Sequence, residues 1–302
     1  MSRLERLLTL KHNSWVTSLV LQDDRVATAA NDGTVGIWQI EGTQLLSVRQ
    51  EQPVQAIALS SSFLACGCAD ATVTLWTIPA GEKVQTFHHE KAVGAVAILG
   101  DILSSGSDDC TISVWRLPTG ERLHTLHHED AVSAVALGGE WLASGSDDQS
   151  TLLWKLPEGE KLLTLRHEGW VSSVALTENF VASASSDKVV GIWSVPGGEK
   201  VRELRFKDFV FSVDFCGSQL ACGSRDGSVT VWGLPEGKRL LGFRHSLPES
   251  TRPGHESDPY PIHAVAMKGD ILACAPADLS AVLWRMPSSL TDAEGTADEG
   301  AS

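Results

Sequence analysis

The sequence predicts an all-β protein, a seven-bladed β-propeller made of one module repeated along the chain. Three observations lead to this prediction. An aspartate stands six residues before a tryptophan in seven places, successive tryptophans of these pairs are 38, 39, 39, 39, 39 and 52 residues apart, and each unit contains four short strand patterns. The seven pairs are Asp32/Trp38, Asp70/Trp76, Asp109/Trp115, Asp148/Trp154, Asp187/Trp193, Asp226/Trp232 and Asp278/Trp284.

Each module reads as four strands separated by turns. In the fourth repeat the first strand alternates through Val132, Val135 and Leu137, and the second is the small-residue segment 142–146, which ends at Asp147-Asp148. The third strand alternates up to its tryptophan. A Pro-x-Gly turn follows in repeats two to six, and the outer strand then begins with charged residues, which suit an edge exposed to solvent.

The turn after the second strand carries a further repeated feature. A hydroxyl residue follows the spaced aspartate by two positions in six repeats, while Val189 stands there in repeat five. This spacing predicts a turn held by hydrogen bonds between the carboxylate and the hydroxyl. The six residues are Thr34, Thr72, Thr111, Ser150, Ser228 and Ser280.

The two ends of the repeat array complement each other. The last repeat stops at Met286-Pro287 without an outer strand, whereas residues 5–12 align position for position with residues 121–128, an outer strand and the histidine that follows it. We therefore expect the N-terminal strand to complete the last blade within one domain, 1–287. Residues 246–261 form an insertion, and the acidic tail 288–302 is expected to be disordered.

Composition narrows the class of partner. The net charge of −14 and the pI of about 5.1 argue against direct binding to nucleic acid or an anionic membrane, so the expected partners are other proteins or peptides. The N-terminus lacks the apolar run of a signal peptide, and no segment is long enough to span a bilayer. Six cysteines without framework spacing suggest a reducing compartment, so we expect a cytoplasmic or nuclear protein.

The repeats resemble those of the WD40 family over residues 4–287. The period, the spaced aspartate, the tryptophan and most of the histidines agree with the family pattern. The residue after the tryptophan is never Asp, and a larger residue replaces the glycine that usually precedes the histidine. The resemblance implies a β-propeller and, in each regular blade, a buried hydrogen-bonded tetrad of His, Ser or Thr, Asp and Trp.

Four repeats carry all four members of that tetrad. Repeats two and six have Gln50 and Phe206 in place of the histidine, together with Cys66 and Cys222 in place of the hydroxyl. In repeat seven Cys274 takes the hydroxyl position, and the insertion is expected to disturb the tetrad. Blades two, six and seven should therefore be softer than the blades with His12, Thr28, Asp32 and Trp38; His89, Ser105, Asp109 and Trp115; His128, Ser144, Asp148 and Trp154; and His167, Ser183, Asp187 and Trp193.

Metal binding and nucleophilic catalysis are the competing interpretations of these residues. His88-His89 and Cys66-Gly67-Cys68 are possible ligand pairs, but one histidine of each pair recurs in register with the repeat, as a structural role requires. No phosphate loop, nucleophile elbow or zinc-helix motif is present. We therefore predict no catalytic residue, no metal, no cofactor and no small-molecule substrate.

The residue just before the first strand of each blade should border the central opening. Around the ring it is Trp15, Pro53, Ala92, Ala131, Trp170, Phe209 and Pro261. Trp15, Trp170, Phe209 and the neighbouring Tyr260 form what we call the aromatic arc, and Arg225 lies in the same half. These five are the predicted partner-binding residues, although the aromatic rings could instead fill gaps between blades. Opposite them stands an acidic arc, Glu90, Asp108, Glu129, Asp130 and Asp147.

These features predict a non-catalytic scaffold for protein–protein interactions, monomeric within a larger complex. The alternative is a substrate-recognition subunit of a ubiquitin ligase, but no F-box-like segment is present. A propeller enzyme would need polar groups unique to one side of the channel, and only repeated ones are apparent in the sequence. Specificity could lie in the aromatic arc or in the insertion, which could also be a spacer.

Overall fold

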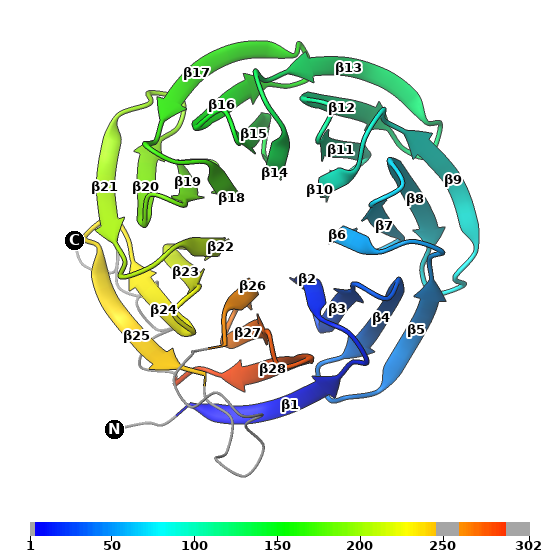
Figure 1. Cartoon of the computed structure of the whole chain (residues 1–302), viewed down its shortest axis with the longest axis horizontal. Coiled ribbons are helices and arrows are strands. Elements are labelled where there is room, and N and C mark those ends of the chain that lie inside the picture. Colours follow the sequence, from blue (N-terminus) through cyan, green and yellow to red (C-terminus); the bar gives the residue numbers. More distant parts are fainter. Residues whose placement is uncertain (1–3, 246–259, 288–302) are drawn as a thin grey trace, which may run out of the picture.

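Seven four-stranded antiparallel sheets surround a central channel (Figure 1). The computed structural model describes residues 4–245 and 260–287, and within these residues every regular element is a β-strand. The innermost strand of each blade lines the channel, and the outermost forms the rim of the disc. The prediction of a seven-bladed β-propeller is confirmed.

Each blade presents its strands in chain order from the channel outward, except the last. Blades one to three contain β2 (Val16–Gln22), β3 (Arg25–Ala30), β4 (Thr34–Gln39) and β5 (Gln44–Arg49); β6 (Val54–Leu59), β7 (Phe63–Cys68), β8 (Thr72–Thr77) and β9 (Lys83–His88); and β10 (Val93–Leu99), β11 (Ile102–Ser107), β12 (Thr111–Arg116) and β13 (Glu121–His127). Blades four and five contain β14 (Val132–Gly138), β15 (Trp141–Ser146), β16 (Ser150–Lys155) and β17 (Glu160–Arg166); and β18 (Val171–Leu176), β19 (Phe180–Ser185), β20 (Val189–Ser194) and β21 (Lys200–Arg205). Blades six and seven contain β22 (Val210–Cys216), β23 (Gln219–Ser224), β24 (Ser228–Gly233) and β25 (Lys238–Arg244); and β26 (Ile262–Lys268), β27 (Ile271–Pro276), β28 (Ser280–Arg285) and β1 (Glu5–Lys11).

The N-terminal strand closes the ring, as predicted. β1 pairs antiparallel with β28, with Lys11 opposite Ser280 and Arg6 opposite Trp284. The register shifts between Arg6 and Leu8, just as the outer strand of blade three shifts opposite its own tryptophan. Figure 1 shows the first strand beside the last, so the closure joins the two ends of the array.

The apolar core lies between neighbouring blades. One cluster joins Ala27 and Ile37 of blade one to Val54 and Leu64 of blade two, and similar clusters recur around the ring. Because the two faces of each sheet are covered by the two neighbouring blades, no blade buries its apolar surface alone. Stability therefore depends on an unbroken circle.

The turns between third and outer strands explain the Pro-x-Gly pattern. The glycine of each turn has a φ near +70°, for example 73° at Gly120, whose amide donates to the Arg116 carbonyl at 2.8 Å. Such a φ strains any residue with a Cβ atom. The proposed insertion, 246–261, falls outside the described residues except for its last two positions, and the tail 288–302 lies wholly outside them. Among the described residues there is no helix with the length and apolarity needed to cross a membrane.

Removal of residues 1–11 tests the closure. The variant loses β1 and exposes the backbone edge of β28, so we expect aggregation or poor solubility, because an unpaired edge strand is a template for pairing between chains. Light scattering coupled to size-exclusion chromatography measures the outcome. A soluble monomer with unchanged melting would show that β1 is not needed for the closed ring; removal of residues 288–302 serves as the control.

Candidate interaction face and central channel

The spaced aspartate closes the turn between the second and third strands of its blade. In blade three Asp109 Oδ1 accepts hydrogen bonds from the Thr111 amide at 2.9 Å and from its hydroxyl at 2.6 Å. Cys110, between them, has a φ of 69°, a left-handed conformation that costs a residue with a Cβ roughly 1 kcal/mol. These hydrogen bonds stabilise that conformation. The corresponding φ is positive in all seven repeats, at Gly33, Ala71, Cys110, Gln149, Lys188, Gly227 and Leu279.

The second carboxylate oxygen of the aspartate holds the loop that enters the blade. Asp109 Oδ2 lies 3.1 Å from His89 Nδ1 and accepts a hydrogen bond from the Glu90 amide at 2.9 Å. His89 Nε2 lies 2.6 Å from Ser105 Oγ. We assign the ring proton to Nδ1, so Nε2 accepts the hydroxyl proton. Blades four and five repeat the arrangement with His128 to Asp148 (2.8 Å) and Ser144 (2.8 Å), and with His167 to Asp187 (3.1 Å) and Ser183 (2.7 Å).

Tryptophan joins these networks in more than one way. In blade four Trp154 Nε1 donates to Ser144 Oγ at 2.9 Å. In blades three and five Trp115 and Trp193 meet the histidine ring edge-on, with centroids 5.7 and 5.6 Å apart. In blade one the ring of His12 lies edge-on to Trp38, and His12 Nε2 is 3.1 Å from the Thr28 hydroxyl, while Asp32 binds Thr34.

Burial keeps these histidines neutral. It lowers the pKa of His128, and the hydrogen bond and charge of Asp148 offset only part of that effect. Burial alone would raise the pKa of Asp148, but hydrogen bonds from Ser150 and His128 outweigh it and hold the pKa below its ordinary value. A neutral imidazole bound to a carboxylate is the state that the assigned proton positions require.

Blades two and six lack the histidine network, but their tryptophans form other hydrogen bonds. Trp76 Nε1 donates to the Thr74 hydroxyl at 3.0 Å, and Gln50 Nε2 donates to the same oxygen at 2.9 Å. In blade six Trp232 Nε1 donates to Thr230 at 2.9 Å. The hydroxyl has thus moved from the second strand to the third, which the sequence comparison missed.

The aspartates of blades six and seven also have partners. Arg244 Nη2 binds Asp226 Oδ2 at 2.8 Å, in place of the histidine that Phe206 replaces. In blade seven His245 Nε2 lies 2.9 Å from Asp278 Oδ2, and both side chains are nearly buried. The histidine–aspartate pair persists beside the insertion, but its ring binds through Nε2, where blades three to five use Nδ1. The tetrad of blade seven is therefore altered, with Cys274 in the hydroxyl position.

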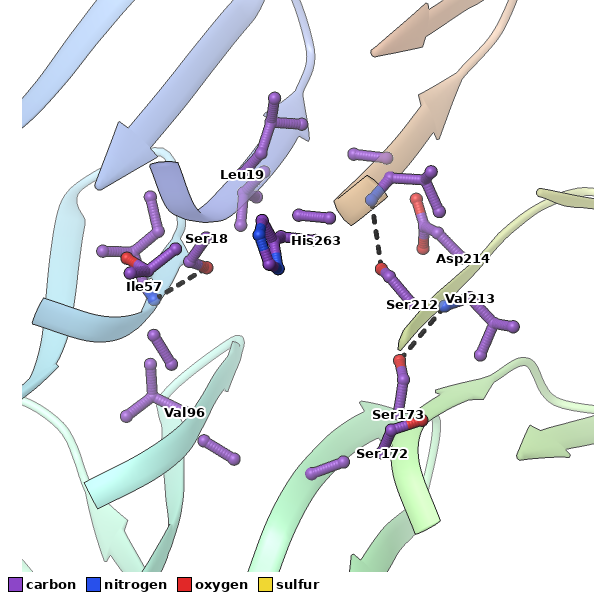
Figure 2. A pocket seen from close by; sticks show the side chains of 18 of the residues that line it. Ser18, Leu19, Ile57, Val96, Ser172, Ser173, Ser212, Val213, Asp214 and His263 are labelled. Carbon is purple, nitrogen blue, oxygen red and sulfur yellow. Dashed lines mark hydrogen bonds between the residues drawn. The ribbon is translucent and has the colours of Figure 1, made fainter. Parts of the chain in front are cut away.

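The inner strands are linked across blade boundaries by side chains. Each innermost strand has one edge without a strand partner, and its amides need other acceptors. Ser18, Ser173 and Ser212 accept hydrogen bonds from the Ile57, Val213 and Val265 amides of the next blades at 3.2, 3.1 and 3.0 Å (Figure 2). These hydrogen bonds connect blade one to blade two, blade five to blade six, and blade six to blade seven.

Asp214 extends the link between blades six and seven. Its Oδ2 accepts a hydrogen bond from the Met267 amide at 2.7 Å, and two residues further along Cys216 Sγ lies 3.1 Å from the Gly269 nitrogen. Burial raises the pKa of Asp214 to about 7, although backbone hydrogen bonds act in the other direction. The equivalent position holds alanine in five blades and Val20 in blade one.

His263 is a second departure from the repeat inside the channel. Figure 2 shows its ring within the channel, and it stacks on Phe211 with centroids 5.9 Å apart and planes 24° apart. The equivalent position holds Phe211 in blade six and, in the remaining blades, Thr17, Gln55, Gly94, Ser133 and Ser172. The expectation that all polar channel groups are repeated ones is therefore wrong: Asp214 and His263 are unique to blades six and seven.

The predicted partner-binding residues separate into two groups. Trp15 and Trp170 line a cavity of about 320 Å³ at one mouth of the channel, together with Phe211 and His263. Phe209 lies beneath the edge of Trp170, with centroids 6.0 Å apart, and the Arg225 guanidinium stacks on Phe209 at 5.4 Å.

Tyr260 is half-buried just before β26 and does not border the mouth cavity defined by the described residues. Phe211 and His263 were missed because they lie two residues after the position compared around the ring. The signal was available in the sequence, since they replace small or polar residues at one column of the repeat.

Comparison with known proteins agrees with this geometry. The family model described as WD domain, G-beta repeat, matches residues 4–39, 81–116, 120–155, 159–194 and 198–233, more than half of the chain. The chain belongs to the WD40 family. A search of curated proteins finds no match. Among solved structures, the computationally designed Ika8 protein is similar in fold, with a TM-score of 0.70 and 23% identity over 93% of this chain and all of that one.

The two WD40 repeats outside the family matches are those that end at Trp76 and Trp284. Both have a cysteine in the tetrad hydroxyl position, and the structure still forms complete blades from them. In the described part of this WD40 chain, no three His, Cys, Asp or Glu side chains are grouped as metal ligands. None of its six cysteines, all of which lie in the described residues, forms a disulfide, and burial raises the pKa of Cys68 to about 11.

Two adjacent serines of β11 test the value of the WD40 tetrad. Ser105 and Ser104 are both fully buried, but Ser105 binds His89, whereas the Ser104 hydroxyl has no hydrogen-bond partner among the described residues. We expect Ser105→Ala to lower the free energy of unfolding by about 1–3 kcal/mol, because it leaves a buried ring nitrogen unpaired. The matched Ser104→Ala should be neutral or stabilising. Urea denaturation measures both, and equal losses would contradict a role for the network.

Asp214 predicts a dependence of stability on pH. Its pKa rises from 3.8 to about 7 on folding, so the folded protein holds this proton more tightly, and the stability it contributes is lost as the pH rises between those values. Asp214→Asn keeps an acceptor for Met267 but does not ionise. We expect the variant to match the unmodified protein at low pH and to exceed it by roughly 4 kcal/mol at pH 8.

Thermal and urea unfolding from pH 4 to 8 measure this difference. Asp101→Asn, a change of one exposed carboxyl group, is the control and should show a constant difference over the same range. If Asp214→Asn also differs by a constant amount, the carboxyl group does not titrate in this interval.

Proposed function

We propose that this WD40 chain is a non-catalytic scaffold that binds a peptide or partner domain over the channel mouth bordered by Trp15 and Trp170. The carrying observation is that these two, 59% and 39% exposed, are the only exposed residues among the ten tryptophans, and both border the same cavity. Exposed tryptophans that meet at a hollow are the usual anchors of a protein interface.

The physical basis is the surface that a partner would cover. A large aromatic side chain buries on the order of 150–250 Å² when covered, and each Å² of apolar area is worth about 25 cal/mol. Trp170 is braced from the side by Phe209, so it loses little freedom on binding. The mouth is therefore already arranged for a partner.

The unique polar groups of the channel are already occupied by protein contacts. Asp214 binds the Met267 amide, and the His263 ring stacks on Phe211. WD40 propellers generally act as scaffolds, which supports a binding role over a catalytic one. A cytoplasmic or nuclear location belongs to the same proposal and is supported by six cysteines that form no disulfide in the described structure.

Affinity capture from cell extract with Trp15→Ala/Trp170→Ala tests the proposal. We expect the double variant to lose the specific partners that the unmodified protein retains, by about tenfold or more, because interface tryptophans often contribute more than 2 kcal/mol each. Quantitative mass spectrometry measures the retained fractions. Circular dichroism and thermal melting establish that the fold persists.

The matched control is Val84→Ala/Leu162→Ala, which truncates two exposed apolar side chains on the outer strands β9 and β17. It should retain every partner. If the tryptophan variant keeps its partners, or if the control loses the same ones, the channel mouth is not the binding face.

A further inference from the structure

The mouth cavity continues into the channel. A second cavity of about 310 Å³ lies along the inner strands and shares Thr17, Gln55, Ser133, Ser172 and His263 with the mouth. The two therefore form one continuous space that leads from an aromatic entrance to a polar interior. An occupant of the mouth would be influenced by charges in both.

The charge available along this space near neutral pH is negative. Among the described residues around both cavities, only Asp214 and His263 titrate, and no lysine or arginine borders either cavity. Burial lowers the pKa of His263, so its ring is neutral near pH 7. The one remaining charge that can form is the carboxylate of Asp214, and Lys268 on β26 offsets it only weakly.

The rim adds further negative charge beside blades three and four. Ser133, which lines the mouth, donates its hydroxyl proton to Asp147 Oδ1 at 2.9 Å, and this contact places Asp147 at the edge of the cavity. Burial and then the neighbouring Asp147 carboxylate raise the pKa of Asp108, while Lys91 counteracts only part of this effect. The repulsion between these two carboxylates is relieved either by a proton or by a cation.

The mouth also offers ring faces. Trp15 and Trp170 are exposed there, and Phe211 forms part of the wall. Aromatic faces attract cations as well as hydrocarbon. Arg225, the cation of this half, is stacked on Phe209 and does not border the cavity. The space thus has aromatic side chains at its mouth, one carboxylate at its edge and another deeper in, and no lysine or arginine among the described residues that line it.

We propose that this mouth binds the lysine or arginine side chain of a partner peptide, with its hydrocarbon stem against Trp15 and Trp170 and its charge toward Asp147. The inference rests on the proposed function and names the class of partner. Asp214 lies four residues below the first channel residue of β22, about 13 Å along the strand, so it acts through its field and not by direct contact. The alternative occupants of the mouth are an aliphatic or an acidic residue of the peptide.

Peptide pools that differ at one central residue distinguish these occupants. Each pool has four randomised positions on either side of arginine, lysine, citrulline, norleucine or glutamate, and the fraction retained on immobilised full-length protein is measured by mass spectrometry. Citrulline matches arginine in shape without its charge. We expect arginine or lysine pools to be retained about five- to tenfold more than citrulline and norleucine pools, with the preference falling as salt rises.

Variants assign the preference to named groups. Asp147→Asn should reduce retention of the cationic pools severalfold, Asp214→Asn should reduce it less, and both should leave norleucine retention unchanged. Asp101→Asn removes one exposed negative charge at the far end of blade three and should change nothing. Trp15→Ala/Trp170→Ala should abolish retention of every pool.

Three outcomes overturn the inference. Equal retention of citrulline or norleucine would show an apolar site, preferential retention of glutamate would show the opposite charge preference, and no retention above the tryptophan variant would exclude a linear cationic peptide. None of these removes the proposed function if captured partners still depend on Trp15 and Trp170. If capture is independent of the tryptophans, the proposed function falls as well.

Discussion

The structure depends on one carboxylate, used seven times. In the most complete blades the spaced aspartate accepts four hydrogen bonds, two at each oxygen. Through Asp109 Oδ1 it stabilises a turn whose middle residue has an unfavourable φ, and through Oδ2 it fixes the incoming loop by way of His89 and the Glu90 amide. The same carboxylate thereby fixes the turn, the entry loop and the orientation of the buried histidine. The loops that border the channel mouth are held in position by these hydrogen bonds.

Where the histidine is missing, other contacts compensate. Blade six lacks the histidine, yet Arg244 binds its aspartate and Thr230 receives the tryptophan proton. Its inner strand is also joined on both sides, by Ser173 from blade five and by Ser212 and Asp214 to blade seven. Blade six is therefore stabilised by contacts between inner strands. Blades three to five have, in addition, the buried histidine–aspartate networks that blade six lacks.

The repeat made most of the fold predictable, because period, strand pattern and the match between residues 5–12 and 121–128 depend only on order along the chain. The networks of His89, His128 and His167 followed from register for the same reason. The hydrogen-bond partners of individual side chains were not predictable where they depend on side-chain orientation. Thr74 is an example, because its position in the sequence does not show that its hydroxyl lies beside the indole of Trp76. Phe211, His263 and Asp214 were overlooked because only the column before the inner strand was compared, although the inner strand itself faces the channel.

In a ring of similar blades, the residues that depart from the repeat are the ones that distinguish this protein from other propellers. Alanine occupies the Asp214 position in five blades, so the fold has no need of a carboxylate there, and burying one is unfavourable even with the Met267 hydrogen bond. Exposed tryptophans are similarly unnecessary for closing a ring whose blades already cover each other. Both unfavourable features open onto one continuous space, and a ligand that covers the rings and supplies positive charge would offset both at once.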